Sequence, residues 1–217
     1  MEEIKNNIIT FIKAILAGIM IGIGAIIYLS CTSKVVGSFL FAIGLFVIIS
    51  FQFNLYTGKI GYMNNLYAWK HNWLYILLIW LGNFVGTFAI GSLICFTRLA
   101  PILCAAAQTI CTIKLTDNFV SLLILSFFCG MLMYTAVEGS KIPNHFGQIL
   151  IIFLCVMVFI LCGFEHCIAN MAYITIAGMW SWEALGAIGI MTLGNSLGGV
   201  FIPIMKRIIR KLETPKT

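Results

Sequence analysis

The stretch Leu81-Gly82-Asn83-Phe84-Val85-Gly86 recurs 112 residues later as Leu193-Gly194-Asn195-Ser196-Leu197-Gly198, and both copies lie inside apolar runs. The leucine, both glycines and the asparagine keep their spacing. The repetition indicates that the chain consists of two related halves.

Upstream of each copy, a second apolar run is interrupted by polar residues. The interruptions are Phe53-Asn54-Leu55-Tyr56-Thr57-Gly58 in the first half and Gly163-Phe164-Glu165-His166, followed by Asn170, in the second. A duplicated unit whose second hydrophobic element is broken in this way is typical of a transporter or channel with its site near the middle of the bilayer.

The composition indicates an integral membrane protein. Hydrophobic residues make up 61% of the 217 residues and charged residues only 9%, which leaves too little polar surface to cover a soluble globule. The apolar runs are too long and too continuous for the alternating strands of a membrane barrel. We therefore predict an all-α fold.

Other classes of function find little support. The eight cysteines form no C-x-x-C pair and do not cluster with histidine, so we expect no disulfide framework, no metal site and no cofactor. The net charge of +6 is spread over short loops and the C-terminus, which argues against nucleic acid. Cys167 lies beside His166, but no third orienting group accompanies a thiol nucleophile, so we do not expect an enzyme.

Six membrane spans are predicted, three in each half. They cover about 8–30, 36–68 with a break near 53–58, 72–98, 118–137, 146–179 with a break at 163–167, and 183–209. Because three is odd, the second half (about 118–209) enters the membrane from the side opposite to the first (about 8–98), so the repeat is inverted. We interpret 100–117 as an extramembrane linker, the first apolar stretch as a retained span, and residues 1–217 as one transmembrane domain.

The positive charges predict the orientation. With both termini in the cytoplasm, ten Lys and Arg residues lie inside and three outside, as the positive-inside rule favours. The inside residues are Lys5, Lys13, Lys59, Lys70, Lys141, Lys206, Arg207, Arg210, Lys211 and Lys216; the outside residues are Lys34, Arg98 and Lys114. We therefore expect a multi-pass protein of the inner (plasma) membrane.

The glycines of the repeated motif are explained by close helix packing, but its asparagines are not. An asparagine in hydrocarbon needs hydrogen-bond partners, and a broken helix nearby has free backbone groups that need the same. We expect Asn83 and Asn195 each to brace the break in its own half, with Asn54 and Glu165 also structural. The alternative is that each asparagine joins two intact helices or two protomers.

At each break, the second half-helix begins with unpaired N–H groups that favour an anion. These starts fall near Thr57, which adds a hydroxyl, and near His166, whose ordinary pKa of ~6.5 allows it to exchange a proton. An ionisable residue inside the membrane is a functional-site hypothesis by default. His166 and Thr57 are therefore the leading candidates for a substrate station.

The second break carries a recognisable signature. Gly163-Phe164-Glu165-His166-Cys167-Ile168-Ala169-Asn170-Met171 resembles the G-F-E-H-S-x-A-N-M motif of the formate/nitrite transporter family, and Leu55-Tyr56-Thr57-Gly58 resembles its L-F-T-[GS] loop. The two Gly-Asn motifs match those of that family's third and sixth helices. The resemblance covers essentially the whole chain.

This resemblance implies an aquaporin-like protomer with six spans, assembled as a homopentamer with a pore in each protomer. Such proteins pass small monovalent anions, often together with a proton. The implied central station comprises Thr57, His166 and Asn170. The implied constrictions are Phe41, Leu45, Leu55, Tyr56 and Phe159, and Lys114 lies near the family's vestibule lysine.

The chain departs from the family's loop at three positions. Asn54 stands where an acidic or small residue is usual, Tyr56 replaces the usual phenylalanine, and Lys59 follows the Thr-Gly pair. These changes make the loop less negative and place a phenol at a predicted constriction. They could favour anions or alter selectivity.

The function predicted from the sequence is a channel or transporter for a weak-acid anion, with formate first and nitrite or hydrosulfide as alternatives. Between apolar constrictions a bare anion would lose most of its hydration, whereas the neutral acid would not, so passage is expected to be linked to a proton. A neutral-solute aquaporin-like pore would be expected to carry Asn-Pro-Ala motifs and a constriction arginine, and the breaks contain neither.

Overall fold

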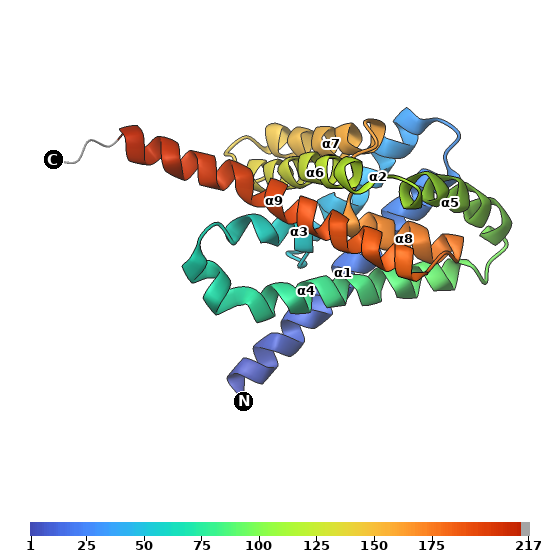
Figure 1. The fold of residues 1–217 in the computed structure, drawn as a ribbon, viewed down its shortest axis with the longest axis horizontal. Coiled ribbons are helices and arrows are strands. Elements are labelled where there is room, and N and C mark those ends of the chain that lie inside the picture. The colour runs from blue at the N-terminus through green and yellow to red at the C-terminus, as the bar shows by residue number, and fades with distance from the viewer. Residues whose placement is uncertain (214–217) are drawn as a thin grey trace.

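The computed structural model describes residues 1–213, apart from the side chain of Leu66, and contains helices but no strand in this range. The all-α prediction is confirmed for these residues; Lys216, which the charge count places inside, lies beyond them. Figure 1 shows the arrangement. The elements are α1 (Glu2–Ser30), α2 (Lys34–Ser50), α3 (Tyr56–Lys59), the 3-10 helix η1 (Ile60–Tyr62), α4 (Leu66–Ile94), α5 (Ala100–Leu115), α6 (Phe119–Gly139), α7 (His145–Leu161), α8 (Cys167–Ala177) and α9 (Trp182–Glu213).

Polar side chains fix where several helices begin. Ser33, Asn65, Asn118 and Asn144 each accept a hydrogen bond from the backbone N–H three residues ahead, at the starts of α2, α4, α6 and α7. Such caps satisfy backbone donors that have no partner inside the helix. The cap at Asn65 explains why α4 begins at residue 66, six residues before the start predicted from the sequence.

The two interruptions are built alike. Helices α2 and α7 each have 17 residues and each is followed by a residue of positive φ, which is Gln52 (φ 54°) after α2 and Gly163 (φ 69°) after α7. The N–H of the next residue then bonds back to the helix, from Phe53 to Ile48 O and from Phe164 to Phe159 O. This pattern is a Schellman C-cap, which ends a helix and turns the chain away from its axis.

The long helices pack in matching pairs, α1 on α4 and α6 on α9. A Cβ at Gly18 would overlap the carbonyl oxygen of Asn83, and a Cβ at Gly130 would overlap that of Asn195. Backbones that approach so closely gain dispersion contacts that lipid tails cannot offer. In Figure 1, α4 and α9 run in opposite directions, as an inverted repeat requires.

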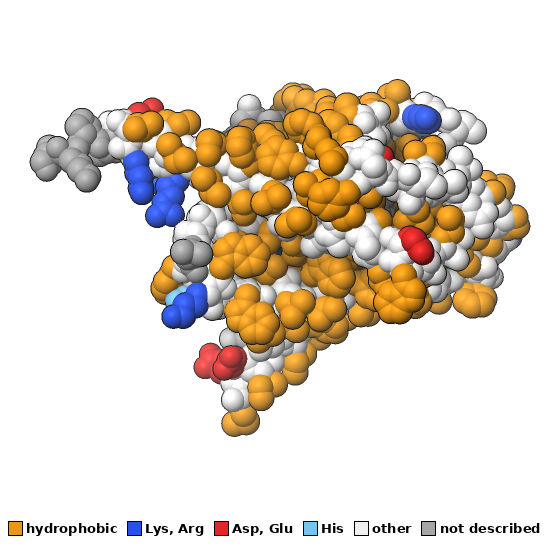
Figure 2. Space-filling model, viewed as in Figure 1, with side chains coloured by type: hydrophobic (Ala, Val, Ile, Leu, Met, Phe, Trp, Pro, Cys, Tyr) orange, Lys and Arg blue, Asp and Glu red, His pale blue; other side chains and the backbone are white. Residues whose placement is uncertain are grey.

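Helices α1, α4, α6 and α9 are long and apolar enough to cross a membrane; α2, α5, α7 and α8 are apolar but shorter. Figure 2 shows apolar side chains over most of one face, with Lys and Arg mainly toward the end where α9 terminates. The apolar face is the surface expected against lipid.

The predicted linker between the halves contains a helix, α5. Leu103, Ala107 and Cys111 on α5 are buried, and Gln108 Nε2 donates to the carbonyl oxygen of Ala177 on α8. Pro101 lies in the first turn, where a proline's missing N–H has no intrahelical partner anyway. The linker is therefore a packed part of the fold.

Candidate functional site

Asn83 of α4 joins the first interruption to α1. Its Oδ1 accepts from the N–H of Tyr56 at 2.8 Å, and its Nδ2 donates to the carbonyl oxygens of Asn54 and Ala14, both at 2.8 Å. The side chain is fully buried. One amide thus supplies partners on both sides of the break and holds it against the neighbouring helix.

Asn195 of α9 makes the same set of bonds in the second half. Its Oδ1 accepts from the N–H of Cys167, and its Nδ2 donates to the carbonyl oxygens of Glu165 and Ser126, each at 2.8 Å. Cys167 is the first residue of α8, so its N–H has no partner within the helix. The two asparagines therefore stand in equivalent positions of the repeat.

The two interruptions meet through one side-chain hydrogen bond. Thr57 Oγ1 lies 2.8 Å from His166 Nε2, and both residues are buried. On its other side, His166 Nδ1 accepts from the N–H of Ala169 at 3.0 Å and so caps the start of α8. Since Nδ1 accepts, a neutral imidazole here carries its hydrogen on Nε2 and donates it to Thr57.

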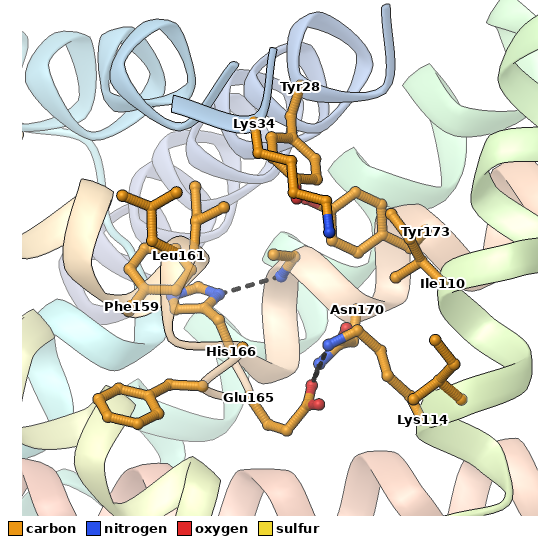
Figure 3. Close-up of a pocket in the computed structure, with 15 residues that line it drawn as sticks. Tyr28, Lys34, Ile110, Lys114, Phe159, Leu161, Glu165, His166, Asn170 and Tyr173 are labelled. Atoms are coloured by element: carbon orange, nitrogen blue, oxygen red, sulfur yellow. Dashed lines mark hydrogen bonds and ion pairs between the residues drawn. The ribbon is translucent and has the colours of Figure 1, made fainter. Parts of the chain in front are cut away.

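A buried carboxylate lies next to this histidine. Glu165 is 4% exposed and forms an ion pair with Lys114 of α5, and its Oε2 accepts from Asn170 Nδ2 at 2.7 Å (Figure 3). A buried charge is tolerated when it is both paired and hydrogen-bonded. The pair also fixes Lys114 on the wall of the neighbouring cavity.

A cavity of about 260 Å³ opens on the α5 side of His166. Figure 3 shows Lys34 and Lys114 pointing into it from different helices, with Asn170 between them. The lining residues are Tyr28, Lys34, Ile110, Ile113, Lys114, Phe159, Ile160, Leu161, Gly163, Phe164, Glu165, His166, Ala169, Asn170 and Tyr173. We call this space the α5-side vestibule.

A second cavity, of about 420 Å³, lies at the opposite end of α2. Its lining residues are Leu45, Ile48, Ile49, Gln52, Phe53, Leu55, Gly58, Lys59, Val137, Ser140 and Lys141. We call it the α3-side vestibule. Both vestibules therefore combine an apolar wall with two lysines.

Four of the predicted constriction residues are buried in the structure. Phe41 and Phe159 are 1% and 4% exposed, and their rings meet edge to face with centroids 5.9 Å apart. The Phe159 ring also stacks on the His166 imidazole at 5.6 Å. On the other side, Leu45 and Leu55 line the α3-side vestibule and are 1% and 2% exposed. Apolar side chains thus lie next to His166 and on the wall of the α3-side vestibule.

The fifth predicted constriction residue, Tyr56, has a polar partner on α9. Its hydroxyl lies 2.7 Å from Ser196 Oγ on α9, and Tyr56 is not among the lining residues of either vestibule. The backbone N–H of Tyr56 donates a hydrogen bond to Asn83 Oδ1. In this structure Tyr56 links the first interruption to α9 of the other half.

Some lining residues escaped the sequence analysis. Lys34, Tyr28 and Tyr173 line the α5-side vestibule, and Lys141 lines the other one beside Lys59. A signal was present for Lys34, because the charge count had already placed it on the same side as Lys114. No sequence signal pointed to the tyrosines, which look like ordinary helix residues.

Similarity to known proteins identifies the family of the chain. A family model described as formate/nitrite transporter matches residues 2–208. This chain belongs to the formate/nitrite transporter family. The resemblance carried by the 163–171 signature is thereby confirmed. Members of this family are membrane channels and transporters, not enzymes.

Some relatives in the formate/nitrite transporter family are named for formate and others for nitrite. The nitrite transporter NirC of Salmonella typhimurium is 26% identical in an alignment of 222 positions, which covers 90% of this chain and 81% of that protein. The formate channel BtFdhC of Bacillus thuringiensis is 30% identical in an alignment of 183 positions, which covers 76% of this chain and 69% of that protein. Similarity to these relatives does not separate formate from nitrite.

A solved structure described as a pentameric formate channel with formate bound is similar in fold. The TM-score is 0.79 at 23% identity, and the match covers 95% of this chain and 98% of that chain. The similarity establishes the fold of the formate/nitrite transporter family for this chain.

Proposed function

We propose that this protein conducts small monovalent weak-acid anions across the membrane, with formate as the leading substrate and nitrite or hydrosulfide as alternatives. Relatives named as formate channels and nitrite transporters support this substrate class. In this proposal α2 with α3 and α7 with α8 each cross the membrane once, which completes six spans with both termini in the cytoplasm. Five copies assemble, as in the pentameric neighbour.

The observation that carries the proposal is the His166–Thr57 hydrogen bond between two vestibules. An anion that enters the α5-side vestibule passes Lys34, whose charge raises the local anion concentration, and Lys114, whose charge is already paired with Glu165. It then takes the place of Thr57 Oγ1 as acceptor of the Nε2–H of His166. Asn170, whose amide holds Glu165, keeps the acidic group away from the anion.

The proton that neutralises the anion enters in this proposal from the bulk solution as hydronium and reaches the anion through vestibule water, so no hydroxide is left behind. A neutral His166 that gave up its Nε2 proton would become an imidazolate, and a doubly protonated ring would set Nδ1–H against the N–H of Ala169. His166 therefore acts as a fixed donor that orients the anion and its water. The protonated, neutral acid then passes Leu45 and Leu55. It avoids the free-energy cost of burying a bare anion, which is on the order of several kcal/mol.

The test is flux in liposomes. Purified protein should transport formate, nitrite or hydrosulfide, and a pH gradient should drive it. His166→Phe is expected to abolish flux, whereas His166→Gln, which keeps a side-chain N–H donor but cannot hold an extra proton, is expected to retain part of it. The same change at the exposed His145, His145→Phe, serves as the control.

Two results would overturn this proposal. One is a wild-type protein that transports none of these anions, and the other is a His166→Phe variant that transports as fast as wild type. Loss of all flux in His166→Gln, with normal assembly, would refute the donor role and favour a histidine that transfers its own proton. Native mass spectrometry of the purified protein tests the pentamer separately.

A further inference from the structure

Two cysteines lie in contact at the junction between the halves. Cys95 belongs to the turn that follows α4, and Cys104 lies one turn inside α5. Their sulfur atoms are 3.8 Å apart, and both residues are partly exposed. A disulfide requires about 2 Å between the sulfurs, so the two thiols must approach each other by roughly another 2 Å to form one.

This pair lies where α4 is joined to α5, in the same connection as Arg98. The positive-inside rule places this connection on the outer side of the membrane. Thiols placed there meet an oxidising environment more often than thiols in the cytosol. The position therefore suits a bond that the cytosol would keep reduced.

A covalent bond at this point would act on the α5-side vestibule. Helix α5 rests on α8 through its buried face, and Cys95 Sγ also contacts the carbonyl oxygen of Ile176 on α8 at 3.7 Å. Further along α5, Ile110 and Lys114 line the vestibule. A bond at Cys104 fixes the first turns of the helix that carries this wall.

We propose that Cys95 and Cys104 form a reversible disulfide that fastens α5 to the end of α4. The oxidant is a small-molecule or protein disulfide. The thiolate of one cysteine attacks it to give a mixed disulfide and releases one thiol; the second cysteine then attacks the mixed bond and releases the other thiol. The two cysteines lose two electrons and two protons, which reduce the oxidant to two thiols.

The test counts free thiols. Purified protein is incubated with oxidised glutathione and then denatured so that its buried cysteines also become accessible, the remaining thiols are alkylated, and the intact mass is measured. Two fewer of the eight cysteines should react, and a peptide digest should contain 95 joined to 104. Cys31→Ser changes another partly exposed cysteine and is expected to leave the bridge intact, whereas Cys104→Ser removes it.

A second readout guards against incidental oxidation. Oxidation should raise the thermal midpoint of the wild-type protein, a reductant should reverse the rise, and Cys104→Ser should show neither change. Eight reactive thiols after oxidation would overturn the proposal, as would glutathione adducts without a bridge. This inference does not depend on which anion is transported, so its failure leaves the proposed function in place.

Discussion

Replacing Asn195 by leucine should destabilise the protein far more than the loss of one surface amide. The substitution leaves the N–H of Cys167 and the carbonyl oxygen of Glu165 without their partners. The third partner, the carbonyl oxygen of Ser126, lies in the middle of α6 and has a helical partner as well. Two buried backbone groups are thus left unsatisfied.

The size of the effect follows from these two groups. An unsatisfied buried polar group costs about 1–3 kcal/mol, which gives about 2–6 kcal/mol for two. Hydrogen bonds in membrane proteins average about 0.6 kcal/mol, so three of them set a lower limit near 2 kcal/mol. We expect about 2–4 kcal/mol, or roughly a 30- to 700-fold fall in the ratio of folded to unfolded protein.

The assay is equilibrium unfolding in mixed micelles, followed by tryptophan fluorescence. Asn72→Leu is the matched control, because Asn72 is half-buried and its Nδ2 bonds only to Ala68 of its own helix. Asn195→Asp is a second, nearly isosteric variant that keeps the acceptor and loses the donor. It should also be strongly destabilised, since an oxygen would face two carbonyl oxygens.

Asn83→Leu should lose a similar free energy of unfolding, because Asn83 makes the equivalent three bonds. The reasoning is refuted if Asn195→Leu unfolds within about 0.5 kcal/mol of Asn72→Leu, a difference too small for two unsatisfied groups. Retention of stability by Asn195→Asp alone would show that the amide N–H groups contribute nothing.

Further predictions concern packing, the station and pH. Gly130→Ala should prevent α6 from closing on α9 and abolish folded protein in size-exclusion chromatography, whereas Gly186→Ala, with open space at its Cβ, should behave as wild type. Thr57→Val should reduce anion flux in liposomes by removing the partner of His166, and Thr57→Ser should retain it; equal flux in the two would contradict the station. Burial opposes the charge of Lys141, but the hydrogen bonds that its ammonium group donates to Tyr62 and Glu138 outweigh this effect and raise the pKa of Lys141 above 10.5. The charged form of Lys141 therefore stabilises the protein at neutral pH, and this contribution is lost as the pH rises above 10.5. Lys141→Met should accordingly flatten the fall in thermal midpoint at alkaline pH.

Much of the fold could be predicted because its determinants are local. The polar residues at 53–58 and 163–167 lie where the structure ends α2 and α7 and starts new helices. Apolar length and composition were sufficient for an all-helical membrane protein. The helical form of 100–115 was missed, because Pro101 and the polar residues there suggested a simple connection and the surface of α8 that α5 covers is not visible in the sequence.

The candidate site was less accessible from the sequence. Its residue types stood out because polar groups in hydrocarbon are costly, which is why His166, Thr57 and the two motif asparagines could be chosen. Their partners could not be chosen in the same way. Tyr56 illustrates this, since the family resemblance implied a constriction residue but gave no partner for its hydroxyl, which lies 2.7 Å from Ser196, 140 residues away along the chain.

The sequence by itself determined that the chain is a duplicated, membrane-embedded helical protein with two polar breaks, because hydrophobicity and helix-ending residues act over a few neighbours. Only the tertiary structure decided that Thr57 meets His166, that Lys114 pairs with Glu165, and that vestibules lie on either side. Those pairings depend on which helix faces meet. Close contact of glycine backbones fixes those faces, and a linear pattern does not specify them.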